Sequence, residues 1–81
     1  MTPPAYPAEA RERKIEGVIL VRVLVGIDGL VGDAYVIQGV DELLDGAALT
    51  AAKTAVFKPA MSENKPVAVW MVVPLEFSLH D

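Results

Sequence analysis

The side chains that most often perform catalysis are few in this sequence, and they stand apart. His80 is the single histidine, and there is no cysteine. A metal site or an imidazole-based triad needs partner groups that this composition does not supply. The carboxylates fall in expected turns, at helix ends and on solvated faces, where capping and hydration account for them. The sequence therefore predicts a protein that is not an enzyme and that holds no metal or cofactor.

The charge balance limits the classes of partner. The 81 residues include 7 lysine and arginine side chains against 11 aspartate and glutamate side chains, for a formal net charge of -4. Nucleic acids and anionic membranes are bound by basic faces, so neither is expected as the main partner. Hydrophobic residues make up 53% of the chain, which is enough for one small folded domain. No apolar run reaches the roughly 20 residues of a membrane helix, so this stretch is expected to be soluble.

The positions of the prolines separate a short N-terminal linker from the folded domain. Three of the six prolines fall within the first seven residues, a clustering that favours an extended linker. We expect residues 1–5 to end such a linker and residues 6–81 to form the domain. Pro7 suits the first position of a short helix over Ala8–Lys14, which ends before Gly17.

Two strands joined by a tight turn are predicted next. Branched side chains recur at every second position over Val18–Ile27, as in a strand. Asp28-Gly29 is the strongest hairpin signal in the chain, so Leu30–Gln38 is expected to return antiparallel. The alternation is disturbed around Gly32-Asp33, which predicts a bulge or a turn irregularity there.

A helix and a last strand follow. The apolar period changes to that of a helix over Leu43–Val56, and Pro59 prevents its continuation. Ser62–Lys65 is expected to be a polar turn. Every second residue is then apolar over Val67–Leu79, and these alternate side chains are expected to point into the core. They are Val67, Val69, Met71, Val73, Leu75, Phe77 and Leu79.

These elements predict an α+β fold, with a three-stranded antiparallel sheet and two helices on one face. The hairpin makes the second strand antiparallel to the first, and the helical crossover makes the third parallel to the second. The first strand is then central, the strand order is 2-1-3, and Val67–Leu79 is an edge. Pro74 fits an edge, because a residue without an N–H is tolerated there.

The face of this sheet opposite the helices is expected to be apolar. Exposed apolar patches usually mark a partner. The alternative is a second packing layer, supplied by the N-terminal segment or by a second copy of the chain. The residues expected on this face are Val18, Leu20, Leu24, Ala68, Trp70, Val72 and Pro74.

The order and spacing of these features resemble the C-terminal domain of TonB-family energy transducers. The resemblance runs from about residue 6 to residue 79. The residues that carry it are Tyr6-Pro7, Ala10, Ile15-Glu16-Gly17, Val21, Val25, Asp28-Gly29, Val31, Leu44-Asp45, Ala48, Phe57, Pro59, Pro74 and Phe77.

The resemblance implies a role in transport across the envelope of a Gram-negative bacterium. Members of this family are anchored in the inner membrane, are driven by an ExbB/ExbD motor and reach through the periplasm. Their C-terminal domain binds outer-membrane receptors that import siderophore-bound iron or vitamin B12. The membrane anchor and most of the linker of such a protein are not in this sequence, so we expect it to be an excised domain.

The resemblance also implies where a partner binds. A short receptor segment, the TonB box, pairs with the last strand by strand addition, beside Tyr6-Pro7. The implied partner-binding residues are Tyr6, Pro7, Trp70, Val72, Val73, Pro74, Leu75, Glu76, Phe77 and Ser78. Ala55 and Glu9 depart from the family pattern, in which many members have Trp and some have Arg. An alternative is a self-associating domain of another envelope protein, not dedicated to iron uptake, in which the same edge pairs with a second copy.

Overall fold

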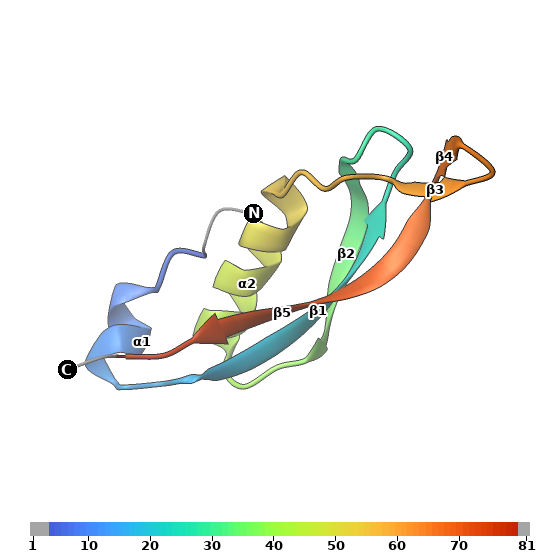
Figure 1. The fold of residues 1–81 in the computed structure, drawn as a ribbon. Helices are drawn as coiled ribbons and strands as arrows, with labels where there is room; N and C mark the ends of the chain where they lie inside the picture. The colour runs from blue at the N-terminus through green and yellow to red at the C-terminus, as the bar shows by residue number, and fades with distance from the viewer. Residues whose placement is uncertain (1–3, 80–81) are drawn as a thin grey trace.

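The computed structural model describes residues 4–79, so His80 and residues 1–3 of the expected linker lie outside the described part. Two helices and five strands make up the fold (Figure 1). In chain order they are α1 (Ala8–Glu12), β1 (Gly17–Val25), β2 (Val31–Gln38), α2 (Glu42–Thr54), β3 (Ala60–Ser62), β4 (Lys65–Val67) and β5 (Val69–Phe77). None of the helices within residues 4–79 has the length and apolar character needed to cross a membrane.

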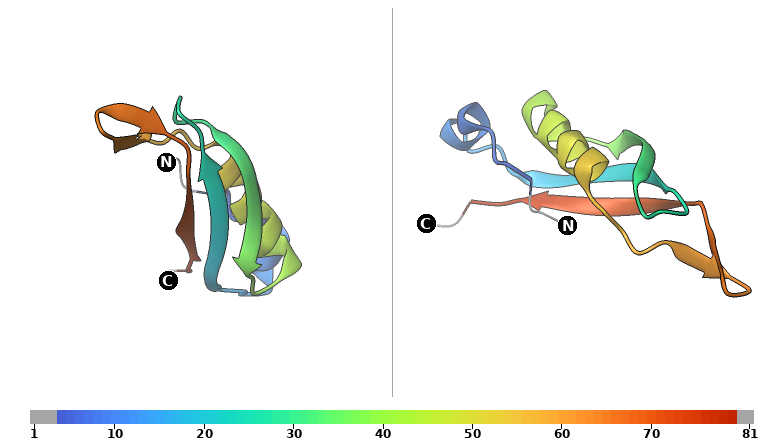
Figure 2. Two further views of the ribbon diagram at one scale, coloured as in Figure 1. Left: turned by 90° about the vertical axis from the view of Figure 1, so that its right-hand side faces the viewer. Right: turned by 90° about the horizontal axis from the view of Figure 1, so that it is seen from above.

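Three strands form the main sheet in the order β2-β1-β5, and both pairings are antiparallel. Both helices lie on the same side of this sheet (Figure 2). The expected α+β fold and 2-1-3 order are therefore confirmed, with β5 as the third strand and an edge. The β1–β5 register is unbroken from Gly17 opposite Phe77 to Val25 opposite Val69.

The β1–β2 hairpin turns at Asp28-Gly29, as expected. The carboxylate of Asp28 accepts a hydrogen bond from the Leu30 N–H at 3.0 Å. Gly29 has φ +83°, and a Cβ there would lie 2.1 Å from the carbonyl oxygen of Phe57. Only glycine fits this position, because both the conformation and the close approach exclude a side chain. The Phe57 N–H donates to the Gly29 carbonyl at 2.8 Å, which ties the turn to the segment after α2.

The second strand is irregular at two points. The register with β1 skips Gly32, since Leu24 lies opposite Asp33 and Val25 opposite Val31. This confirms the irregularity expected around Gly32-Asp33. A second register shift, at Ile37, was not expected from the pattern.

The core lies between α2 and the inner face of the sheet. Asp41 caps α2 by accepting a hydrogen bond from the Leu43 N–H at 3.0 Å. The helix buries one leucine and two alanines, and the alanines let its backbone approach the strands closely. The buried residues of β1, β5 and α2 are Ile19, Val21, Val23, Val25, Val73, Leu75, Phe77, Leu44, Ala48 and Ala52.

The first half of β5 departs from expectation. Val69 and Met71 share the inward phase of Val73, but their side chains are 37% and 38% exposed. The prediction that they are core residues was wrong, because α2 packs mainly on β2 and β1 and leaves this end of β5 uncovered. Val67 belongs to β4 and is also exposed.

A second, smaller sheet was not predicted. The expected polar turn is the tip of a β3–β4 hairpin, in which Glu63 and Asn64 have φ of 50° and 67°. Two successive positive φ values are typical of the tight turns that match strand twist. Residues 61–70 are all exposed, and the hairpin projects beyond the main sheet (Figure 1). The molecule is consequently elongated, with extents of 48 × 21 × 15 Å.

Candidate functional site

The outer edge of β5 offers backbone groups that no other strand uses. Within residues 4–79, β5 pairs with β1 on one side and with no strand on the other, which we call the free edge. At about 3.3 Å per residue, the strand is roughly 30 Å long. An edge of this kind is a ready template for a further strand.

Pro74 indicates which groups face the free edge. The N–H and C=O of one residue point to the same side of a strand, and successive residues alternate. Pro74 lies opposite Leu20 within the unbroken β1–β5 register. The backbone nitrogen of Pro74 carries no hydrogen, so the proline fits this register if its nitrogen faces away from β1 and no ladder hydrogen bond is lost. We therefore infer that Val72 and Glu76 present both N–H and C=O at the free edge, and Pro74 only its C=O.

The side chains of β5 divide between two faces of the sheet. Trp70, Val72, Pro74 and Glu76 are exposed, and Ser78, just after the strand, is exposed as well. The other predicted site residues on this strand, Val73, Leu75 and Phe77, are buried in the core. All three burials were expected from the phase alone. These three residues therefore anchor the strand, whereas their exposed neighbours are accessible to a partner.

Tyr6 packs against the C-terminal end of β5. Its ring meets the ring of Phe77 edge-on, with centroids 5.4 Å apart and planes at 89°. Its hydroxyl donates a hydrogen bond to the carbonyl oxygen of Ile15. Burial raises the pKa of Tyr6 above 10.0, the carboxylate of Glu16 acts in the same direction, and Arg11 opposes both. Tyr6 thus fixes the N-terminal segment on the helix side of the sheet.

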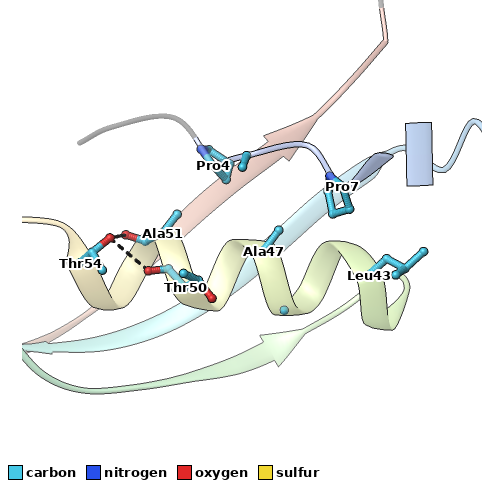
Figure 3. A pocket seen from close by; sticks show the side chains of 9 residues that line it. Pro4, Pro7, Leu43, Ala47, Thr50, Ala51 and Thr54 are labelled. Carbon is cyan, nitrogen blue, oxygen red and sulfur yellow. Dashed lines mark hydrogen bonds between the residues drawn. The ribbon is translucent and has the colours of Figure 1, made fainter. Parts of the chain in front are cut away.

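Pro7 precedes α1 and faces a groove that the sequence did not predict. The groove has a volume of about 480 Å³ and separates the N-terminal segment from α2 (Figure 3). Small side chains at helical spacing were the available signal for it. Its lining residues are Pro4, Ala5, Pro7, Leu43, Gly46, Ala47, Thr50, Ala51 and Thr54.

Trp70 belongs to the sheet face rather than to the free edge. Its ring lies 5.9 Å from that of Tyr35, although β5 and β2 are separated by β1. Strands two places apart are about 9.5 Å apart, so both rings lean toward each other over β1. The guanidinium of Arg22 lies 5.4 Å from the centre of the Trp70 ring. Tyr35 was missed in the sequence, because the bulge at Gly32 obscured the phase of β2. The regular phase of β1 placed Arg22 on this outer face, but its contact with the Trp70 ring was not predicted.

The groups exposed along β5 are suited to binding an extended peptide. The described part of the chain contains no group of three or more His, Cys, Asp or Glu side chains that could hold a metal ion. Its distinctive feature is the row of backbone donors and acceptors along β5, flanked by exposed apolar side chains. Such a row binds an extended peptide through the main chain.

Comparison with known proteins gives two matches. The model of the Gram-negative bacterial TonB protein C-terminal family matches residues 2–79. "Protein tonB2" of Pseudomonas aeruginosa is 38% identical over 78 residues, which are 95% of this chain and 29% of that protein. The chain therefore spans less than a third of the length of the curated relative it matches.

Proposed function

The chain belongs to the family of Gram-negative bacterial TonB C-terminal domains, and from this premise we propose that it binds the TonB box of outer-membrane receptors by strand addition to β5. The domain works in the periplasm as part of an inner-membrane-anchored protein. It couples an ExbB/ExbD-like motor to receptors that import siderophore-bound iron or a similar substrate.

The free edge of β5 is the observation that carries this proposal. It is nine residues long, it keeps an unbroken register with β1, and it stays open on its other side within residues 4–79. A box segment of about six residues would lie along Val72–Ser78, near the Tyr6-Pro7 segment. Because the pairing uses the main chain, receptors with different box sequences can share one site.

The expected affinity is modest. Four to six backbone hydrogen bonds at a net ~1 kcal/mol each correspond to a Kd between about 1 mM and roughly 40 μM, and packing beside Val72 and Glu76 offsets part of the ordering costs. Such an affinity suits a contact that must form and release during transport.

The core contacts of β5 suit the transmission of force. Val73 is 8% exposed, and Leu75 and Phe77 are each 2% exposed, so the strand is held firmly on its inner side. A pull on the added strand would therefore be carried into the packed core and not into a loose segment.

A peptide-binding experiment tests the proposal. Fluorescent TonB-box peptides from several receptors would be titrated with the chain, alongside variants with a central proline or with one exchanged side chain. We expect saturable binding that the proline weakens at least tenfold, since it removes a donor and disrupts the added strand. The exchanged side chain should weaken binding only a few-fold. Equal binding of the proline variants, or no binding by any box peptide at millimolar concentration, would contradict the proposal.

A further inference from the structure

The outer face of the sheet is open beside the free edge of β5. Both helices lie on the opposite side of the sheet (Figure 2). Tyr6 packs on Phe77 on that helix side, so the N-terminal segment from Pro4 onward does not supply the second layer considered above. A strand added to the free edge would therefore extend the open face, and every second side chain of that strand would lie on it.

Glu76 is the single charged side chain within β5 (Val69–Phe77), and it lies on this outer face. Its neighbour across β1 is Val18, an uncharged side chain that is 42% exposed. The carboxylate forms no ion pair with any of residues 4–79. Arg22 on β1 lies four positions away in the register, or about 13 Å, and contacts the Trp70 ring instead. The free edge is thus the side from which a cation can reach Glu76.

An added strand would place one residue directly opposite Glu76. The backbone of Glu76 faces the free edge, so it can pair with an added strand of either direction. Side chains directly opposite each other in neighbouring strands share a face, with Cβ atoms about 4.5–5.5 Å apart. At this distance a cation is attracted to the carboxylate and a second carboxylate is repelled. The added strand also removes water from the Glu76 side chain, which makes an unpaired charge there more costly.

We propose that Glu76 selects receptor segments that carry a lysine or an arginine at the position opposite it. This inference rests on the strand addition proposed above and adds a rule for which segments bind best. The next two positions on the same face of the added strand lie opposite Pro74 and Val72, which are exposed and apolar. The preferred ligand is therefore an extended peptide with apolar side chains at alternate positions and one basic side chain at the end that meets Glu76.

Dependence on position distinguishes this selection from general attraction. The chain has a formal net charge of -4, so any basic peptide is attracted to it. That attraction varies little from one peptide position to the next. Pairing with Glu76 requires one position, because the residues before and after it point to the other face of the sheet. A lysine should be favoured over a glutamate about fivefold at that position and less than about twofold at its two neighbours.

Titration of the chain with a scanned set of fluorescent peptides tests this inference. A neutral TonB-box sequence would carry a single lysine or a single glutamate at each position in turn, and the two affinities would be compared at each position. The parent chain should show the lysine preference at one position. Glu76→Lys should reverse the preference there, and Glu76→Gln should remove it. Glu63→Lys makes the same change of charge at the exposed tip of the β3–β4 hairpin, so it is the matched control and should keep the preference.

The neutral peptide separates a failure of this inference from a failure of strand addition. If it binds while lysine and glutamate peptides bind equally at every position, the selection by Glu76 is overturned and strand addition stands. A lysine preference that is the same at all positions and persists in Glu76→Gln would overturn the selection as well. If none of the peptides binds at millimolar concentration, strand addition is contradicted and the selection by Glu76 falls with it.

Discussion

The two edges of the main sheet differ in their regularity. β5 keeps one register with β1 from end to end, whereas the register of β2 shifts at Gly32 and at Ile37. Bulges twist an edge and interrupt its row of hydrogen-bonding groups. The carboxylate of Asp33 also accepts a hydrogen bond from the Ala34 N–H at 2.9 Å, so β2 satisfies one of its own donors. Both strands lie at an edge, but only β5 presents a regular template.

The two edge strands also differ in how many of their side chains are buried in the core. β5 buries Val73, Leu75 and Phe77, whereas β2 buries Ala34 and only partly buries Val31 and Val36. A strand that receives a partner must itself stay in place, and large buried side chains provide that hold. The open edge and the firm inner face therefore occur on the same strand.

Truncating the anchors should show the largest effect. Phe77→Ala removes a buried ring and should lower the free energy of unfolding by about 3–5 kcal/mol. The corresponding change on the other edge, Val36→Ala, should cost about 1 kcal/mol because that side chain is only partly buried. Urea denaturation of both variants measures the difference. Similar losses would mean that β5 is not the better-anchored edge.

Proline substitutions test which way the backbone of β5 faces. Val73→Pro removes an N–H that bonds to β1 and should destabilise the fold by about 3 kcal/mol. Val72→Pro removes an N–H at the free edge, so the fold should persist while peptide affinity falls. Thermal unfolding and peptide titration of both variants show which of the two N–H groups faces β1 and which faces the free edge. If Val72→Pro is the more destabilising change, the inferred orientation is reversed.

Restoring the missing donor should have a smaller effect on the same edge. Pro74→Ala adds one N–H at the free edge and should tighten box-peptide binding about fivefold, equivalent to a net ~1 kcal/mol. Ile37→Ala on β2 is the control and should leave the affinity unchanged. Unchanged or weaker binding to Pro74→Ala would show that the peptide does not pair at this position.

Tyr6 adds an anchor to β5 that β2 lacks, and its contribution should depend on pH. Because its pKa in the folded state is raised, the stabilisation by the neutral hydroxyl is complete below pH 10 and is lost as the pH rises through the raised value. Tyr6→Phe loses the hydrogen bond to Ile15, which should lower the stability modestly at neutral pH, and should lack this alkaline loss.

Unfolding curves between pH 8 and pH 11.5 compare the two proteins. Tyr35→Phe retains Tyr6 and should behave like the parent chain. An identical alkaline loss in Tyr6→Phe would assign the effect to another group.

Much of this fold was predictable because its signals are local. The period of two, the Asp28-Gly29 turn and the proline at position 74 together predicted the strand order and the edge. The exposure of Met71 was not predictable, because periodicity indicates a shared face and not whether a helix covers it. The β3–β4 hairpin was missed because strands of three residues, one containing Pro66, are too short to show a period.

The candidate site was predictable in part for similar reasons. The alternation along β5 separated buried from exposed residues over its second half, Val73 to Phe77, and Pro74 indicated the open side. The direction in which Trp70 leans depends on Tyr35, which lies two strands away in the sheet. No local pattern in the sequence encodes that contact.

The most direct test of strand addition to β5 is a chemical-shift titration of the isotope-labelled chain with a TonB-box peptide. The account predicts the largest amide shifts along Val72–Ser78, with smaller shifts near Tyr6. It also predicts new protection from hydrogen exchange at Val72 and Glu76, whose N–H groups face the free edge. Largest shifts along β2 or along α2, with no new protection in β5, would contradict it.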